Sequence, residues 1–227
     1  MLGAAPTFTK QTYSNQVASY IRTLIRKGTL EIGAQIKEAF LAERLGISRA
    51  PIREALQALA QEGLITSEPQ KGKHVRQMTG KEIYDSYIVA GILEGAGVAG
   101  SLPSWTEDNM ETFRGVVREL ERATASLDHP DELADVDERF HTTLLMACDN
   151  TRLVEMARTS CATISKYLYY QHWITMFSPA EYAARHLAIA EAVASRDGAH
   201  VESVLRDHYR ETGQRMAEFG VPPYETR

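Results

Sequence analysis

The chain has 227 residues, of which 44% are hydrophobic and 24% charged, a composition that excludes an intrinsically disordered protein. No apolar run reaches the roughly 18 residues of a membrane-spanning helix, and the amino terminus lacks a secretory signal pattern, so we expect a cytoplasmic protein without membrane contact. The net charge of −5 hides an asymmetry, because residues 1–77 carry 11 basic and 6 acidic side chains, whereas residues 78–227 carry 14 and 24. A basic first part joined to an acidic remainder suggests that only the first part meets a polyanion.

The first elements along the chain are predicted to be three helices and a β-hairpin. Apolar residues recur at helical spacing in residues 11–28, 38–46 and 48–63, and each of these stretches ends at a glycine. Residues 64–78 then change to β-prone side chains around a Pro-Gln-Lys-Gly-Lys turn, which is typical of a small hairpin. Three helices and a hairpin in a basic segment predict a winged helix-turn-helix module.

The third helix of this module has the pattern of a recognition helix in a major groove. Ser48 is expected to cap it, and Arg49, Arg53 and Gln57 share its outward face at four-residue spacing. The tip of the wing is expected to hold Lys71, Gly72 and Lys73. These seven residues are our candidates for contact with double-stranded DNA. The alternative is a helical hairpin with solvated arginines.

The segment LAERLGISRAPIREALQALAQEGLI, residues 41–65, resembles the amino-terminal pattern of the GntR superfamily of bacterial transcription regulators. The segment PQKGKHV, residues 69–75, stands where that family has the turn of its wing. The resemblance implies that Ser48, Arg49, Arg53 and Gly72 occupy positions that the family uses at DNA. Ala50 and Ala39 depart from the family pattern, which puts the base preference in doubt but not the binding of DNA.

The rest of the chain is predicted to be all helical. A capping box of Thr79 and Glu82 opens a helical region, so we place the domain boundary at residue 78, with domains 1–77 and 78–227. Six or seven helices are expected, with a break near residues 101–105 and further helices over 106–127, 131–148, 150–173, 178–195 and from the turn at 196–198 to about 219. The predicted fold class is therefore mainly α: a winged helix-turn-helix followed by an all-α bundle.

Histidines in the helical domain are spaced as metal ligands could be. Asp137 and His141 lie one helical turn apart, which by itself is more typical of a solvated pair. His186 and His208, however, each lie 11 residues from Asp197, at the centre of a predicted turn between two helices. In an antiparallel helical hairpin such residues lie level with each other. Three imidazoles and a carboxylate could then converge, a set that suits zinc and also manganese or nickel.

Nearly the whole chain also resembles the FadR-like branch of the superfamily, in its FCD ligand-binding subgroup. The segments DERFH, RHLAIAEAV and LRDHY match three metal-ligand segments of that domain. The resemblance implies that Asp137, His141, His186 and His208 bind a divalent transition metal, most simply zinc. Helix-turn-helix modules usually work in pairs, so we expect a homodimer that binds a pseudo-palindromic operator. The open metal position predicts a small carboxylate as the effector.

The effector site is harder to assign. Many members of the family carry an arginine three residues before the leucine of Leu93-Glu94-Gly95, but this chain has Ala90 there. Asn150 is expected to cap a helix and is also a candidate for effector contact, as are Arg139 and Tyr170. Arg185 and Lys166 are further charged candidates, although solvated positions are the simpler expectation for both.

Three rival interpretations stay open at this point. A metal-sensing regulator would use the ion itself as its effector. A metalloenzyme fused to a DNA-binding module is less expected, because no general base accompanies the ligands. Residues 95–100, GAGVAG, fit a dinucleotide fingerprint, but they lack the preceding strand. Gly91 and Gly95 are instead expected to allow close helix packing, within the chain or between two copies of it.

Overall fold

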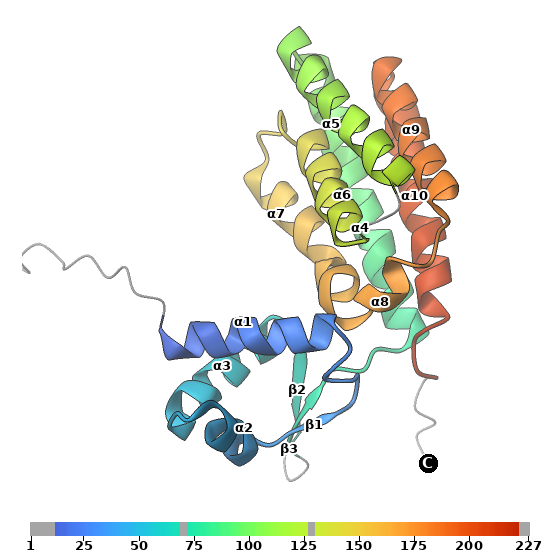
Figure 1. Cartoon of the computed structure of the whole chain (residues 1–227). Helices are drawn as coiled ribbons and strands as arrows, with labels where there is room; N and C mark the ends of the chain where they lie inside the picture. Colours follow the sequence, from blue (N-terminus) through green and yellow to red (C-terminus); the bar gives the residue numbers. More distant parts are fainter. Residues whose placement is uncertain (1–11, 69–71, 127–129, 223–227) are drawn as a thin grey trace, which may run out of the picture. The chain divides into compact units, whose positions relative to one another are not determined.

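The structure, a computed structural model, describes residues 12–68, 72–126 and 130–222. The chain divides into two compact units, and the boundary between them in the sequence falls between Arg76 and Gln77. In the described residues, no helix combines the length and the apolar character that crossing a bilayer requires. The two units are taken separately, with the labels of Figure 1.

The first unit is a small helical domain with a three-stranded sheet. Its elements are α1 (Tyr13–Arg26), β1 (Gln35–Ile36), α2 (Glu38–Leu45), α3 (Arg49–Gln61), β2 (Ile65–Glu68) and β3 (Gly72–Val75). The strands are antiparallel in the order β1-β3-β2. Fully buried apolar residues on α1 and α3, with Ile21, Ile52 and Leu56 among them, form the core. This is the winged helix-turn-helix that the sequence predicts, with the two-residue strand β1 added.

The turn between α2 and α3 shows why these two helices stay close. Gly46 ends α2 in the left-handed region, with φ of 65°, which a residue with a side chain would adopt only at a cost. Ser48 occupies the N-cap position of α3 with extended backbone angles, but its hydroxyl makes no capping hydrogen bond. The expectation that the Ser48 side chain caps this helix is therefore wrong, and the residue is exposed to solvent.

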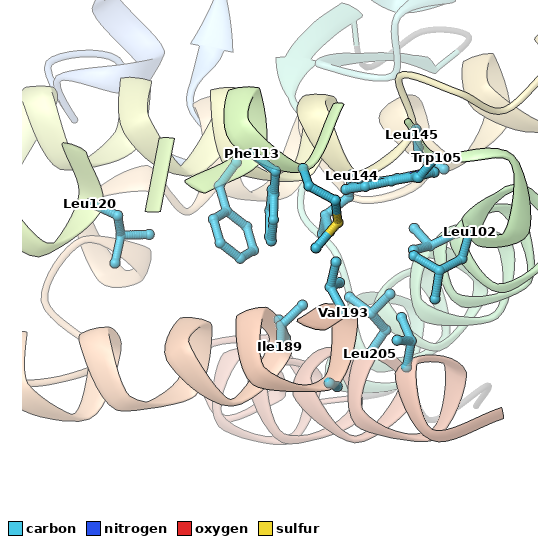
Figure 2. Packing of buried hydrophobic residues seen from close by; sticks show 14 of the residues in the cluster. Leu102, Trp105, Phe113, Leu120, Leu144, Leu145, Ile189, Val193 and Leu205 are labelled. Atoms are coloured by element: carbon cyan, nitrogen blue, oxygen red, sulfur yellow. The ribbon is translucent and has the colours of Figure 1, made fainter. Parts of the chain in front are cut away.

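The second unit is a bundle of seven α-helices among the described residues. Its elements are α4 (Gly80–Ser101), a 3-10 turn (Leu102–Ser104), α5 (Glu107–Ser126), α6 (Pro130–Leu144), α7 (Thr151–Ser160), a π-helix (Ile164–Leu168), α8 (Tyr170–Trp173), α9 (Pro179–Ala194) and α10 (Gly198–Ala217). Helix α4 packs against α7 and α10, α5 packs against α6 and α9, and α9 packs against α10 (Figure 1). Apolar residues on α5, α6, α9 and α10, including Phe113, Leu144, Ile189 and Leu205, form the main core (Figure 2).

One predicted helix is divided in the structure. The sequence predicts a continuous helix over 150–173, but α7 ends at Ser160, and a π-helix follows before the short α8. The Tyr169 amide donates to the Ile164 carbonyl, five residues back, so the backbone turns are wider here than in an α-helix. Such single π-turns are frequent at functional sites, and Cys161 and Ser165 of this segment line the wall of a cavity described below.

The glycines of α4 allow this helix to pack closely on α10 of the same chain. A Cβ atom at Gly91 would lie 2.8 Å from Cβ of Tyr209, and one at Gly95 would lie 3.1 Å from Cγ of Glu202. A Cβ atom at Gly213 on α10 would likewise lie 2.8 Å from Cβ of Tyr87. The expected role of Gly91 and Gly95 in helix packing is therefore seen within one chain, where Tyr87, Tyr209 and Glu94 are buried between the two helices.

Candidate functional site

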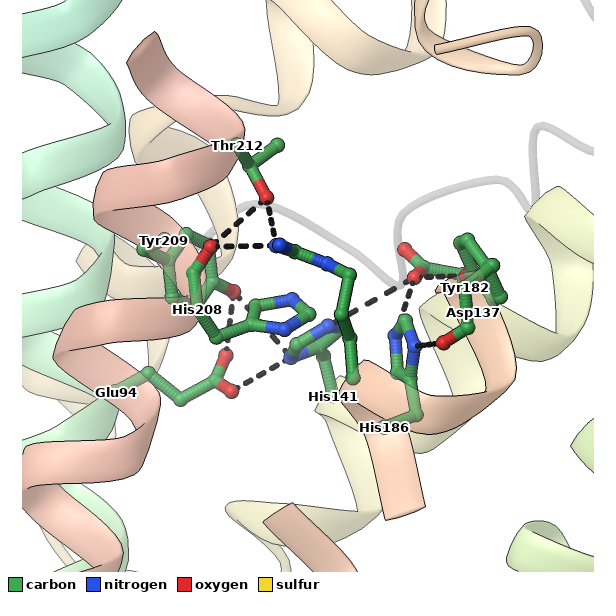
Figure 3. Close-up of polar contacts among 9 residues, drawn as sticks. Glu94, Asp137, His141, Tyr182, His186, His208, Tyr209 and Thr212 are labelled. Carbon is green, nitrogen blue, oxygen red and sulfur yellow. Dashed lines mark hydrogen bonds and ion pairs between the residues drawn. The ribbon is translucent and has the colours of Figure 1, made fainter. Parts of the chain in front are cut away.

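Three histidines from three helices converge inside the second unit. His141 lies on α6, His186 on α9 and His208 on α10, and one ring nitrogen of each lies within 4.8 Å of the others (Figure 3). The rings of His186 and His208 are 4.9 Å apart between centroids, as their equal spacing from Asp197 predicts. The α9–α10 turn therefore sets the register that brings two of the three imidazoles together.

A carboxylate lies beside this cluster. The Oδ1 atom of Asp137 is 3.1 Å from Nε2 of His186 and 3.8 Å from Nε2 of His141. The hydroxyl of Tyr182 donates a hydrogen bond to the same oxygen. Asp137 and His141 lie on one face of α6, so a single helix contributes two adjacent side chains that could bind a metal ion.

Hydrogen bonds to the outer nitrogens fix the orientation of two of the rings. Nδ1 of His141 lies 2.6 Å from Oε1 of Glu94, whose other oxygen accepts from the Tyr209 hydroxyl at 2.8 Å (Figure 3). Nδ1 of His186 lies 2.8 Å from the carbonyl oxygen of Tyr182. Imidazoles that bind metals commonly donate their other N–H to a carboxylate or a carbonyl in this way.

The contact between His186 and Asp137 is the most informative one. A carbonyl oxygen only accepts, so Nδ1 of His186 carries the hydrogen that it shares with Tyr182. In the neutral ring, Nε2 then presents a lone pair to the Asp137 carboxylate at 3.1 Å. Two acceptors at this distance repel each other, so the contact requires either a second proton on His186 or a bound cation.

The charges around the cluster favour a cation as well. Burial lowers the pKa of His141, but the charges of Glu94 and Asp137 outweigh burial and raise it to about 9. Burial raises the pKa of Asp137, but His141 and His186 outweigh burial and leave it below its ordinary value. His208 differs, because burial and the neighbouring His186 and His141 hold its pKa well below the ordinary value, and the ring stays neutral. Two carboxylates among three imidazoles provide the negative charge that a divalent ion would balance.

A cavity of about 60 Å³ adjoins the histidines, and its walls include aromatic side chains and one arginine. Arg185 donates to the His208 carbonyl at 2.8 Å and to the Thr212 hydroxyl at 2.7 Å, and it forms an ion pair with Glu211. Its guanidinium also lies over the ring of Phe177, 4.0 Å from the centroid. The side chain is only 12% exposed, so the solvated position expected for Arg185 is wrong.

Of the other four effector candidates, Lys166 pairs with Glu138 at 2.6 Å and lines only a neighbouring cavity, and the remaining three lie elsewhere. Asn150 caps α7 by accepting from the Leu153 amide at 3.0 Å. Arg139 is half exposed and pairs with Glu119 at 3.0 Å, and the Tyr170 hydroxyl donates to Asp131. None of the three lines the cavity beside the histidines. Ala90 is fully buried on α4, and Arg185 on α9 is the cation at the cavity instead.

The candidate DNA-contacting residues lie on the surface of the first unit. Ser48, Arg49, Arg53 and Gln57 are exposed on or next to α3, as the outward face of that helix predicts. Gly72 is exposed at the start of β3, with φ of 87°, and Lys73 is half-buried. Lys71 lies outside the described residues.

Glu38, which no sequence pattern indicates, links two of the basic side chains on this surface. Glu38, at the first position of α2, accepts from Nε of Arg53 at 2.8 Å and from Nζ of Lys73 at 3.0 Å. These two hydrogen bonds hold the pKa of Glu38 below its ordinary value. The carboxylate therefore links the candidate recognition helix to the wing and fixes the direction of both cations.

Glu94, Tyr182 and Tyr209 were also missed in the helical unit. A signal existed for Glu94, because it is a single acid within the apolar run YIVAGILEGAGVAG. An acid at the centre of such a run, 3% exposed in the structure, needs a partner inside the protein. For the two tyrosines we find no comparable signal in the sequence.

Comparison with known proteins places both units in described families. Residues 13–75 match the family described as bacterial regulatory proteins, gntR family, and residues 85–211 match the FCD domain. The Nta operon transcriptional regulator of Aminobacter aminovorans is 29% identical over 164 residues, which cover 72% of this chain and 75% of that protein. The HTH-type transcriptional repressor RspR of Escherichia coli K12 is 25% identical over 212 residues, 92% of this chain and 91% of its own. The solved structure of E. coli McbR/YncC has a TM-score of 0.69 and 19% identity, and the match covers 92% of this chain and 99% of that one.

Proposed function

This chain belongs to the GntR family of bacterial regulatory proteins and carries an FCD domain, so it is a DNA-binding transcriptional regulator, and we propose that a small organic acid bound at a metal ion controls it. The observation that carries the metal is the convergence of His141, His186 and His208, whose ring nitrogens lie within 4.8 Å of one another, with the Asp137 carboxylate beside them. We propose that Asp137, His141, His186 and His208 hold a divalent transition metal, with zinc as the first choice. When bound, the ion would offer a Lewis-acidic position to an oxygen ligand.

The cavity supports an anionic effector. Arg185 provides a positive charge at the cavity wall, and Phe177, Trp173 and Tyr182 provide apolar surface. Aromatic surface combined with convergent polar groups is typical of a small-molecule site. We propose that Arg185 takes the role that the family resemblance implies for an arginine at the position of Ala90.

The action on DNA is proposed to be repression. At least one relative of this chain over most of its length, RspR, is named a repressor. We propose that Arg49, Arg53 and Gln57 approach base edges or phosphates from the major groove, and that the wing with Lys71, Gly72 and Lys73 contacts the backbone. Binding that depends on several phosphates should weaken steeply as salt rises, and an affinity that stays flat with salt would contradict this proposal.

A homodimer is proposed from the exposed face of α4. Val89 and Ile92 are 44% and 39% exposed on this helix, and Met156 is 43% exposed on the neighbouring α7. Apolar side chains gathered on adjacent exposed helices are typical of a contact between copies of a chain. A dimer would bind a pseudo-palindromic operator with two copies of α3, and sedimentation equilibrium at micromolar concentration should give the mass of two chains.

One experiment tests the effector and the metal together. Thermal unfolding is followed with a panel of small organic acids, first with zinc-loaded protein and then after removal of the metal with a chelator. We expect an acid to raise Tm in the zinc-loaded protein and to have little effect after chelation. Equal shifts in both conditions would remove the metal from acid binding. A response of operator affinity to metal alone, with no acid effective, would favour the metal-sensing regulator.

A further inference from the structure

Two buried tyrosines face each other between α4 and α10, and only one of them has a hydrogen-bond partner. Tyr87 is 2% exposed, and its ring centroid lies 6.5 Å from that of Tyr209. The Tyr209 hydroxyl donates to Glu94 at 2.8 Å. The Tyr87 hydroxyl, fully removed from solvent, forms no hydrogen bond within the described part of the chain.

A buried hydroxyl without a partner is unfavourable and calls for an explanation. Most buried polar atoms are hydrogen-bonded, and a group left unsatisfied destabilises the fold. The Ser165 hydroxyl lies close enough to lower the pKa of Tyr87, but the contact falls outside the geometry of a normal hydrogen bond. Burial raises the pKa of Tyr87 well above its ordinary value, so the hydroxyl keeps its proton and can donate.

The position of this hydroxyl indicates what it would meet. Tyr87 lines the same cavity as the three histidines and Arg185. A second unpartnered buried atom, Nδ1 of His208, belongs to a residue of the same cavity wall. His208 is already assigned to the metal, so the Tyr87 hydroxyl is the group of this cavity wall that the proposed function leaves without a role.

We infer that the Tyr87 hydroxyl donates a hydrogen bond to a second polar group of the effector and so selects acids that carry such a group. The inference rests on the proposed function, in which an acid binds at the histidine cluster. Tyr87 is then a specificity-determining residue, and the ligand class becomes short acids with a hydroxyl, oxo or second carboxylate group. A plain alkanoate would leave the Tyr87 hydroxyl unsatisfied and would bind more weakly.

The size of the cavity limits this class further. A volume of about 60 Å³ is several times the roughly 10–15 Å³ that a cavity must offer to hold one water molecule. A neighbouring cavity of about 100 Å³ shares Asp137, His141, Cys161, Ser165 and Tyr209 with it. Together the two cavities suit a molecule of a few carbon atoms, not a long acyl chain.

The test removes the Tyr87 hydroxyl from the protein and, separately, one hydroxyl from the acid. Binding of glycolate against acetate, and of lactate against propionate, is measured by calorimetry with zinc-loaded wild-type protein and with Tyr87→Phe. The members of each pair differ by one hydroxyl. We expect wild-type protein to prefer the hydroxylated member of a binding pair by about three- to tenfold, as one net hydrogen bond provides. Tyr87→Phe should bind both members equally.

Stability measurements distinguish this role from a structural one. Tyr87→Phe removes only an unsatisfied atom, so its Tm without acid should equal or exceed that of the wild type. Tyr209→Phe removes the hydrogen bond to Glu94 and should lower Tm. Tyr84→Phe makes the same chemical change about one turn earlier on α4, outside the cavity wall, and should keep the wild-type preference between acids.

The outcomes separate the inference from the proposed function. An equal preference in wild type and Tyr87→Phe, or no preference in wild type, overturns the role of Tyr87 while acid binding still stands. A marked loss of Tm in Tyr87→Phe also overturns it, because the hydroxyl would then have a structural partner. If zinc-loaded wild type binds none of the four acids, the small-acid effector is wrong and the inference falls with it.

Discussion

The two units present their candidate functional groups in opposite ways. In the winged-helix unit these groups lie at the surface, where the Arg53 side chain is 64% exposed. In the helical unit they lie inside, where the His186 side chain is 2% exposed and has polar partners at both ring nitrogens. A surface arginine can be removed with little effect on folding, whereas a buried histidine takes its partners' hydrogen bonds with it.

This difference decides how variants of each unit must be measured. Loss of DNA binding in a variant of α3 can be assigned directly to the missing contact. Loss of acid response in a variant of the helical unit can also follow from a weakened core. Variants of the helical unit therefore need a stability measurement beside each binding measurement.

Removal of a buried metal ligand should have the largest effect. We predict that His208→Ala loses nearly all bound zinc, because one of the three converging imidazoles is gone. A ligand present at about 100 times its Kd stabilises a fold by about 2.7 kcal/mol, so Tm should fall as well. Elemental analysis of the purified protein and a melting curve provide the two measurements.

His200→Ala is the matched control for this variant. His200 lies on the same helix, near its start, and is exposed. Its replacement should leave both zinc content and Tm unchanged. Should His200→Ala lose the metal while His208→Ala keeps it, the proposed ligand set would be wrong.

Replacement of Arg185, the cation at the cavity, should have the next largest effect. We predict that Arg185→Gln weakens binding of an effective acid by about 1.5–3 kcal/mol, the range for hydrogen bonds to charged groups, without loss of zinc. Arg185→Lys keeps the charge but not the planar fork, so its loss should be smaller. Calorimetry and elemental analysis check the two parts, with the exposed Arg210→Gln on α10 as control. Unchanged acid affinity in Arg185→Gln would contradict the role of Arg185.

Variants of the exposed unit should affect DNA alone. Arg49→Ala and Arg53→Ala should each weaken operator binding by about 1–3 kcal/mol if these side chains contact base edges. Tm should not change, because both residues lie on the outward face of α3. Electrophoretic mobility shift with an operator selected from random duplexes measures the first effect. Wild-type affinity in both variants would mean that α3 is not the recognition helix.

The smallest effect is expected from Glu38→Gln. This change removes one negative charge and releases Arg53 and Lys73 from their shared partner. Affinity for random DNA should rise slightly and become more dependent on salt, while the ratio of operator to random binding should fall. A parallel rise of both affinities, with the ratio preserved, would show that Glu38 contributes charge but does not position Arg53.

The two units also differ in how well the sequence predicts them. The recognition helix and the wing are local patterns, so Arg49, Arg53 and Gln57 could be assigned to one face from their spacing alone. The strand β1 was missed because its two residues, Gln35 and Ile36, are too few to show a periodicity. Glu38 was missed because its partners lie 15 and 35 residues away in the sequence.

In the helical unit, prediction succeeded where geometry could be counted along one hairpin. The spacing of His186 and His208 about Asp197 predicts their register, since rise per residue is constant in α9 and α10. The contact of Glu94 with His141 joins two residues that lie 47 positions apart in the sequence, so no local pattern specifies it. The π-helix after α7 was missed because apolar spacing does not distinguish it from an α-helix. The direction of Arg185 depends on partners that belong to another helix.

The order of the histidines along the chain has a consequence during synthesis. His208 follows His141 by 67 residues, and it follows Arg76, the last residue of the first unit, by 132 residues. At about 5–20 residues per second, the ribosome needs roughly 7–26 s to pass from Arg76 to His208. A nascent chain therefore has its complete DNA-binding unit well before the three imidazoles can meet. For that interval each new molecule carries the part that finds DNA without the part that could answer to an effector.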